Sequence, residues 1–113
     1  MNDIINIDWD QLHQVSEDDT EFELELLKML AEDVKIHIAE LRQAIVERDP
    51  IAIAHEAHYI KGASASVGIV SITTLANQIE RLAIKKLMPK AALLVEQMAI
   101  DLGRLEAYLA TRN

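Results

Sequence analysis

The chain has no cysteine, three glycines, two prolines and only one Trp, one Phe and two Tyr among its 113 residues. Without cysteine it can form neither a disulfide nor a thiolate metal site. With so few aromatic residues, the core must be built from Leu, Ile, Val, Ala and Met, and this composition favours helices over sheets. The scarcity of glycine and proline is typical of long helices joined by short loops.

Positive charge is also scarce, since 11 Lys and Arg stand against 19 Asp and Glu and give a net charge of −8. Nucleic acids and anionic membranes attract Lys and Arg, so neither is an expected partner. No apolar run approaches the roughly 20 residues of a membrane span, and the N-terminus lacks the basic and apolar regions of a signal peptide. We therefore expect a monomeric, cytoplasmic protein with a single domain over residues 1–113.

Hydrophobic periodicity predicts two helices in the first half of the chain. The first is short and covers residues 7–15. A polar break at residues 16–20, rich in residues that cap helices, separates it from a long second helix that runs to about Arg48. The apolar stripe of this second helix is expected to comprise Phe22, Leu26, Leu30, Val34, Leu41 and Ile45, with His37 or Ile38 filling the gap.

Three more helices are predicted in the second half. Asp49 and Pro50 are typical of a helix start, as the capping residue and the first helical residue. Gly68 is expected to end that third helix in a left-handed conformation. Ser71 is the expected cap of a fourth helix, and Pro89 opens a fifth. The predicted fold is all-α: an antiparallel four-helix bundle with a short additional N-terminal helix.

Residues 57–68 contain a histidine and a lysine among small residues. A helix brings positions i, i+3, i+4 and i+7 to one face, so His58 shares a face with Lys61. Gly62 and Ala65 lie on the same face and have almost no side chain, which should leave the imidazole accessible. Glycine inside a helix costs about 0.5–1 kcal/mol relative to alanine. Either access to His58 or close packing between helices would justify Gly62.

This stretch resembles the signature of the histidine-containing phosphotransfer (HPt) family of bacterial and fungal phosphorelays. In that family the histidine is followed after two residues by Lys-Gly, then by small residues and another Gly; His58, Lys61, Gly62 and Gly68 match these places. The similarity continues through residues 71–80 and into the region before His58, so it covers nearly the whole chain. It implies a helical bundle that carries phosphate rather than an enzyme. The sequence shows no Gly-rich phosphate loop and no kinase motif set.

The resemblance also implies the site. His58 would accept a phosphoryl group from a receiver-domain phospho-aspartate and pass it to another receiver aspartate. Lys61 would offset the roughly −2 charge of that group. Glu80 matches the family's Glu or Gln that hydrogen-bonds the active histidine from the next helix. Gln78 is the other candidate, but it lies roughly 200° around the helix from Glu80, so both cannot face the ring. No cofactor is implied for this chain, and Mg²⁺ is expected on the receiver.

The expected partners are receiver domains of response regulators, either separate or attached to a hybrid sensor histidine kinase. An exposed apolar patch near His58 would bind them, drawn from the first helix, the start of the long helix and the third helix. Trp9, Leu12 and Tyr59 are the candidate contact residues.

Two other interpretations remain open. The chain could dock on receivers without carrying phosphate, or it could be a small metal-binding bundle that uses His55, His58 and Glu56. The metal interpretation is weaker, because His-Glu-Ala-His is one residue shorter than the metalloprotease pattern. We therefore predict no metal site, and expect His13 at the surface and His37 at the boundary of the core.

Overall fold

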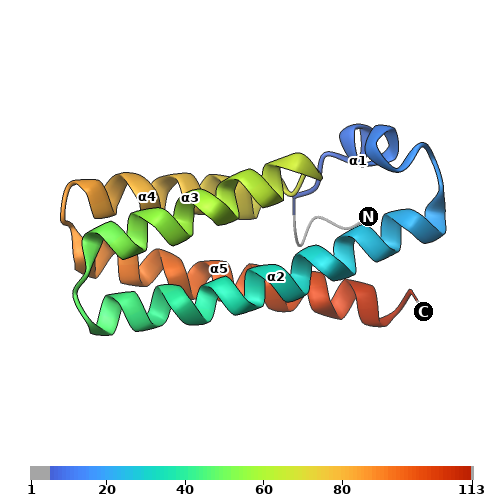
Figure 1. Cartoon of the computed structure of the whole chain (residues 1–113). Helices are drawn as coiled ribbons and strands as arrows, with labels where there is room; N and C mark the ends of the chain where they lie inside the picture. Colours follow the sequence, from blue (N-terminus) through green and yellow to red (C-terminus); the bar gives the residue numbers. More distant parts are fainter. Residues whose placement is uncertain (1–5, 113) are drawn as a thin grey trace.

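The computed structural model describes residues 6–112 and contains five helices within that range (Figure 1). They are α1 (Trp9–Ser16), α2 (Thr20–Val46), α3 (Pro50–Ser66), α4 (Val70–Ile84) and α5 (Met88–Ala110). Each long helix packs against the next one in the chain, α5 closes the ring against α2, and α1 packs on α2. The predicted antiparallel four-helix bundle with a short N-terminal helix is confirmed, and it measures 42 × 22 × 21 Å. No helix in the described part is both long and apolar enough to cross a membrane.

The core follows the predicted helical spacing. On α2 the buried residues are Leu27, Leu30, Ala31, Val34, Ile38, Leu41 and Ala44. Ile38, not His37, fills the gap in the predicted stripe, and Leu26 and Ile45 are half-buried. Phe22 is exposed, so the prediction that the stripe begins there is wrong. At this end α2 extends beyond α3, which leaves its first turn with fewer helices to pack against (Figure 1).

Aspartates cap the first three helices. The side chains of Asp8, Asp19 and Asp49 each accept a hydrogen bond of 3.1 Å from a backbone N–H in the first turn of α1, α2 and α3, respectively. These bonds satisfy N–H groups that have no partner within the helix. The predicted start of the third helix at Asp49 and Pro50 is confirmed.

The fourth helix is capped differently from the prediction. Ser71 lies inside α4, which begins at Val70, and no side chain caps it. Instead the backbone carbonyl of Asn6 accepts hydrogen bonds from the N–H groups of Val70 and Ser71, at 2.8 and 3.3 Å. The chain before α1 thus supplies the acceptor that a capping side chain would have supplied. Sequence spacing within α4 could not reveal this, because the acceptor comes from a distant segment.

Gly68 makes this contact between distant segments sterically feasible. It follows α3 with a φ of +80°, the left-handed conformation predicted for it. Its carbonyl accepts a 2.7 Å hydrogen bond from the Asp8 N–H. A Cβ at Gly68 would lie 2.8 Å from the Asp8 carbonyl oxygen. Both the backbone conformation and the close approach therefore require glycine.

We expect Gly68→Ala to lower the free energy of unfolding by about 1–3 kcal/mol, because it combines left-handed strain with a backbone clash. Urea denaturation followed by circular dichroism measures the change. The matched control is Gly103→Ala on α5, where a Cβ would meet nothing within 4 Å. That change should stabilise the helix by about 0.5–1 kcal/mol. Equal effects at the two sites would contradict the special role of Gly68.

Candidate functional site

His58 projects outward from the middle of α3. Ala57 and Ile60, on either side of it in sequence, are fully buried and fix which face of α3 packs into the core. The side chain of His58 is therefore directed away from the core and is 68% exposed. An incoming group can approach the ring without displacing any packed residue.

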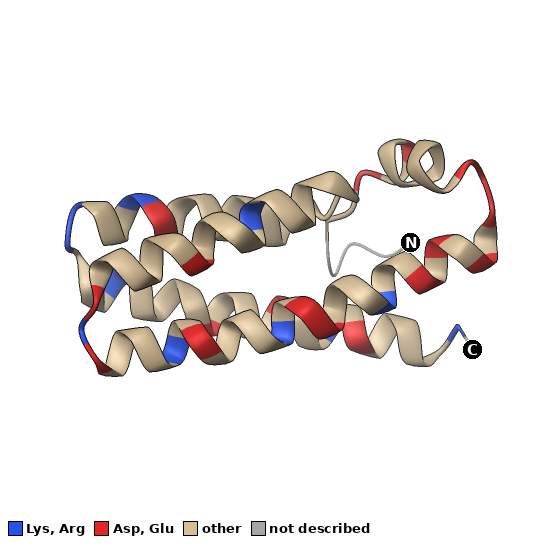
Figure 2. Cartoon of the chain, in the orientation of Figure 1, with Lys and Arg blue, Asp and Glu red and all other residues tan. Residues whose placement is uncertain are grey.

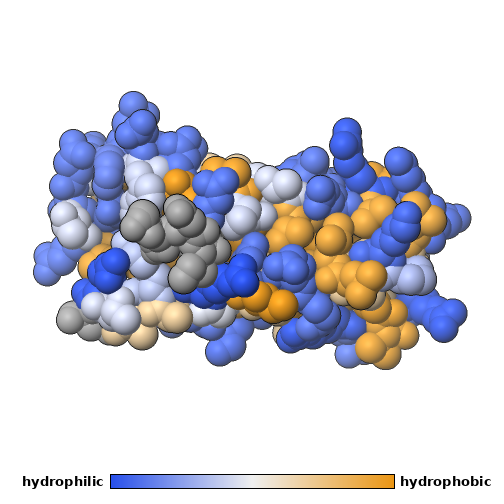
Figure 3. All heavy atoms as spheres, turned by 180° about the vertical axis from the view of Figure 1, so that it is seen from behind, coloured by the Kyte–Doolittle hydropathy of each residue, from blue (hydrophilic) through white to orange (hydrophobic). Residues whose placement is uncertain are grey.

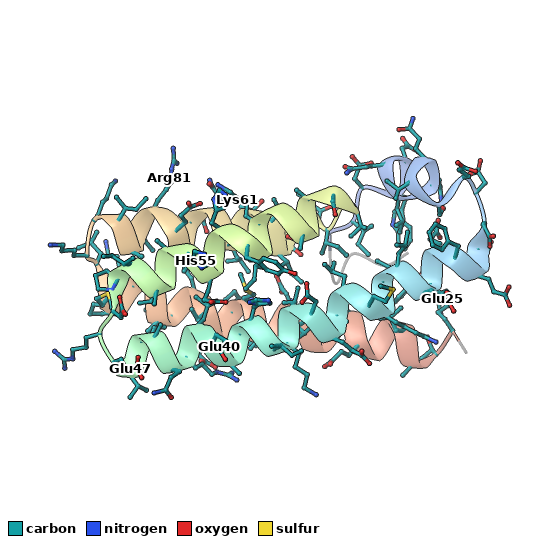
Figure 4. All side chains as sticks on the ribbon, viewed as in Figure 1. Glu25, Glu40, Glu47, His55, Lys61 and Arg81 are labelled. Atoms are coloured by element: carbon teal, nitrogen blue, oxygen red, sulfur yellow. The ribbon has the colours of Figure 1, made fainter. Side chains whose placement is uncertain are left out.

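Glu80 on α4 joins His58 to Lys61. Its Oε2 lies 3.0 Å from His58 Nδ1, and its Oε1 accepts a 2.7 Å hydrogen bond from Lys61 Nζ. The carboxylate is mostly covered, and Lys61 reaches it from the outer side of α3 (Figure 4). The structure brings the three residues together as the resemblance implies. Gln78 is exposed and has no such contact with the ring.

The charge of Glu80 determines how the ring is oriented. The hydrogen bond from Lys61 lowers the pKa of Glu80 below its ordinary value, the bond from His58 adds to this effect, and partial burial opposes it. The carboxylate is thus ionised at neutral pH and can only accept hydrogen bonds. In the neutral ring the hydrogen of their shared bond must therefore be on Nδ1, and the lone pair is on Nε2, the ring nitrogen farther from Glu80.

The small residues near His58 have different roles. A Cβ at Gly62 would meet nothing within 4 Å, so close packing between helices does not require this glycine. Access to His58 remains the explanation for it. Ala65 is also exposed, and its backbone carbonyl accepts a 2.6 Å hydrogen bond from the side chain of Gln11 on α1. Gly68 does not touch the ring and acts through the turn between α3 and α4.

His13 also has a carboxylate at Nδ1, but its surroundings differ from those of His58. Its Nδ1 lies 2.6 Å from Glu23. The hydrogen bond to Glu23, with smaller contributions from Asp18 and Asp10, raises the pKa of His13 above its ordinary value. The acidic neighbours that cause this shift would also repel a phosphoryl group.

His37 is unsuitable for a different reason. Only 22% of its side chain is exposed, its Nδ1 lies 2.5 Å from Glu56, and its Nε2 lies 3.6 Å from Asp33. Both ring nitrogens therefore face carboxylates. Of these three histidines, His58 alone combines a carboxylate on Nδ1, an exposed Nε2 and a neighbouring lysine.

The predicted partner-contact residues are only partly at the surface. Leu12 is fully buried, so the prediction that it contacts a partner is wrong. It is the residue that anchors α1 to the core, which apolar spacing alone does not distinguish from a contact residue. Trp9 is half-buried, with its ring centroid 5.9 Å from that of Tyr108. Tyr59 is exposed beside His58.

Sequence reasoning missed the residues that hold Tyr59. Its hydroxyl donates a 2.7 Å hydrogen bond to Asp33 on α2, and its ring stacks on His37 at a centroid distance of 4.0 Å. Asp33 lies 13 residues before the end of α2 and Tyr59 lies nine residues after the start of α3, a difference of about one helical turn that a long tyrosine side chain can span. In an antiparallel helix pair, such positions lie near one another, so the spacing was a signal that could have revealed the contact.

An open groove lies between α2 and α3, beside Tyr59. Met29 and Ile36 are exposed along it, and the lining contains no basic residue. The apolar residues that line it are Leu26, Met29, Leu30, Ile36, Tyr59, Ala63 and Val67.

The structure does not support the metal-binding interpretation. Glu56 contacts His37 on α2 and so does not join His55 and His58 in a site. Within residues 6–112, no group of three or more His, Asp or Glu residues is placed to hold a metal ion.

Comparisons with known proteins agree with the fold. The model of the Hpt domain family matches residues 25–110. The fold is similar to histidine-containing phosphotransfer protein B from Pseudomonas aeruginosa (TM-score 0.86, 23% identity, 95% of this chain and 93% of that one). It is also similar to the histidine-containing phosphotransfer domain of ArcB from Escherichia coli (TM-score 0.72, 23% identity, 96% of each chain). A search of curated proteins finds no significant match.

The depressed pKa of Glu80 predicts a pH-dependent contribution to stability. A carboxylate whose pKa is lower in the folded state stabilises the fold above the unfolded-state pKa, near 4.5. This stabilisation is lost as pH falls through the folded-state pKa. Wild type should therefore lose more stability than Glu80→Gln between pH 6 and pH 3, as measured by urea denaturation across that range. A difference between the two proteins that stays constant with pH would contradict the assignment.

Proposed function

Since this chain belongs to the Hpt domain family, whose members are phosphorelay intermediates of two-component signalling, we propose that His58 carries the phosphoryl group. The observation that supports this choice is the arrangement of Glu80, which holds Nδ1 of His58 with one oxygen and Nζ of Lys61 with the other. It leaves Nε2 exposed as a nucleophile with a cation beside it.

The transfer follows from this geometry. The Nε2 lone pair attacks the phosphorus of a receiver phospho-aspartate, an N–P bond forms, and the P–O bond to the aspartate breaks to release its carboxylate. The Nδ1 hydrogen stays in place, so the ring becomes positively charged and the Glu80 carboxylate stabilises that charge. An aspartate of a second receiver then attacks the same phosphorus and returns the electron pair to Nε2.

Lys61 would offset the negative charge of the phosphoryl group both when His58 receives it and when His58 passes it on. Its ammonium has three hydrogen-bond donors, of which Glu80 uses one, so it can also contact phosphoryl oxygens. Gly62 and Ala65 leave space for the group and for the partner surface. The members of this family carry phosphate and are not kinases. We extend this to the chain's own chemistry: it has no ATP site and needs no cofactor, and Mg²⁺ belongs to the receiver.

The partners in this proposal are receiver domains, including those of hybrid sensor histidine kinases, and the transfer takes place in the cytoplasm. The groove between α2 and α3 is the proposed contact surface, because most of its lining residues are apolar and it adjoins His58 through Tyr59. Tyr59 is held there by Asp33, and Trp9 would contribute only its exposed part. The chain would act as a monomer that binds one receiver at a time.

We expect His58→Gln to abolish labelling by a ³²P-labelled phospho-receiver in the presence of Mg²⁺, while the circular dichroism spectrum stays unchanged. The wild-type label should be stable to base and labile to acid, as a phosphoramidate is. His13→Gln is the matched control, because His13 has the same Nδ1–carboxylate contact, and it should still accept label. Label on His58→Gln would refute the assignment. A wild type that binds receivers but never takes label would instead support a pure docking module.

A second test concerns the contact surface. Ile36→Glu should raise the KM for the phospho-receiver by about tenfold or more, because it buries a charge in an apolar interface. Ile100→Glu on α5 is the matched control, since Ile36 and Ile100 are 62% and 52% exposed and only Ile36 lines the groove. Rapid-quench transfer at several receiver concentrations separates KM from kcat. Equal effects of the two substitutions would exclude this groove as the docking surface.

A further inference from the structure

The positive charge of this acidic protein is concentrated at one end. Residues 81–95 contain Arg81, Lys85, Lys86 and Lys90 and no acidic residue, although the whole chain has a net charge of −8. Figure 2 shows this basic segment where α4 ends and α5 begins, at the opposite end from the acidic turn between α1 and α2. By contrast, the charged residues at the start of the long helix α2 are Glu21, Glu23 and Glu25, all of them acidic.

These four basic side chains do not take part in the ion pairs that stabilise the fold. Arg42 pairs with Glu96, Lys61 with Glu80 and Arg104 with Asp101. Within the described part of the chain, none of the four basic residues at 81–90 has a carboxylate partner. Arg81 projects freely outward from α4 (Figure 4).

The same region is apolar as well as basic. A groove of about 380 Å³ lies between α4 and α5, with Leu82 and Leu94 lining it beside Arg81 and Lys85. Ile84, Leu87 and Leu93, in the same stretch of the chain, are exposed. The rear view shows hydrophobic surface gathered over this half of the molecule, interrupted by hydrophilic side chains (Figure 3). We call the groove and its two cations the α4–α5 groove.

We propose that the α4–α5 groove is a second docking site, which binds an acidic, leucine-bearing segment of a partner protein. An amphipathic helix places apolar side chains in such a groove at positions i, i+3 or i+4, and i+7. Its flanking carboxylates would then meet Arg81 and Lys85. The site lies between α4 and α5, whereas the proposed receiver surface lies between α2 and α3, so both can be occupied together.

Charge favours this occupant over two others. A second copy of the chain, related by twofold symmetry, would bring Arg81 and Lys85 of each copy close together, and like charges in an interface oppose association. An anionic membrane presents an extended negative plane, which would also face the acidic remainder of the molecule. A compact acidic segment can instead match the groove without approaching the other acidic surfaces.

The test uses a fluorescein-labelled amphipathic peptide of about 16 residues, roughly four helical turns. It has leucines on one face and glutamates elsewhere, and fluorescence anisotropy measures its affinity. We expect Arg81→Glu/Lys85→Glu to weaken binding by about tenfold or more. The neutral double variant Arg81→Gln/Lys85→Gln should lose an intermediate amount of affinity. It is included in case the two glutamates of the first variant disturb folding. Lys35→Glu is the matched control, because Lys35 is an exposed lysine on α2 away from the groove.

The leucine face is tested with a second peptide of identical composition in which the leucines are spread around the helix. It should bind about tenfold more weakly, since it keeps the charge but loses the apolar face. Equal affinity for the two peptides, or an equal effect of Lys35→Glu, would overturn the proposal. So would failure of the first peptide to bind, or sedimentation of the protein with phosphatidylcholine–phosphatidylglycerol vesicles in place of peptide binding. None of these readouts depends on phosphoryl transfer.

Discussion

The turn at Gly68 sets the register between α3 and α4, and the proposed site depends on that register. The left-handed glycine ends α3, its carbonyl accepts the Asp8 N–H, and the preceding chain caps α4 through the Asn6 carbonyl. A turn this short allows only a few registers between the two helices that it connects. In the observed pairing Glu80 lies opposite both His58 and Lys61, which are one turn apart on α3. A change of register would move Glu80 away from at least one of them.

Glu80 then performs two tasks with one charge. It fixes the tautomer of His58, and it holds Lys61 near the place where the phosphoryl group would arrive. These tasks are coupled, because Lys61 is the main cause of the lowered pKa of Glu80. A carboxylate that is ionised can stabilise the positive ring formed during transfer, whereas a protonated one cannot. His13 and His37 also contact a carboxylate through Nδ1, but of the three only His58 shares its carboxylate with a lysine.

The sequence was sufficient to predict whatever depends on local spacing. The five helices, the Asp49–Pro50 start and the left-handed Gly68 all follow from periodicity and backbone preferences. Contacts between segments that are distant in the sequence were harder to predict. Ser71 has the chemistry of a cap, but the Asn6 carbonyl already occupies that position.

Exposure was equally hard to predict from a helical stripe. A stripe shows which side of a helix is apolar, but not how far its neighbours extend. Phe22 is therefore exposed, because it lies in the first turn of α2 beyond the end of α3. Leu12 is buried, because it lies on the face of α1 that packs on the core. The contact between Glu80 and His58 was predicted because the family resemblance supplied a pairing that spacing alone could not supply.

The distribution of charge suggests why the bundle has two kinds of apolar surface. The groove beside Tyr59 has exposed Met29 and Ile36, and the only charged residues in its lining are the acidic Glu32 and Asp33. Apolar area would supply much of its affinity. A relay intermediate gains from such a surface, because it must release each receiver after transfer and bind another. The α4–α5 groove instead combines apolar residues with unpaired cations, which favours selection of one partner by charge. Because the two grooves lie on different helix pairs, receivers can exchange at one groove while a partner occupies the proposed second site.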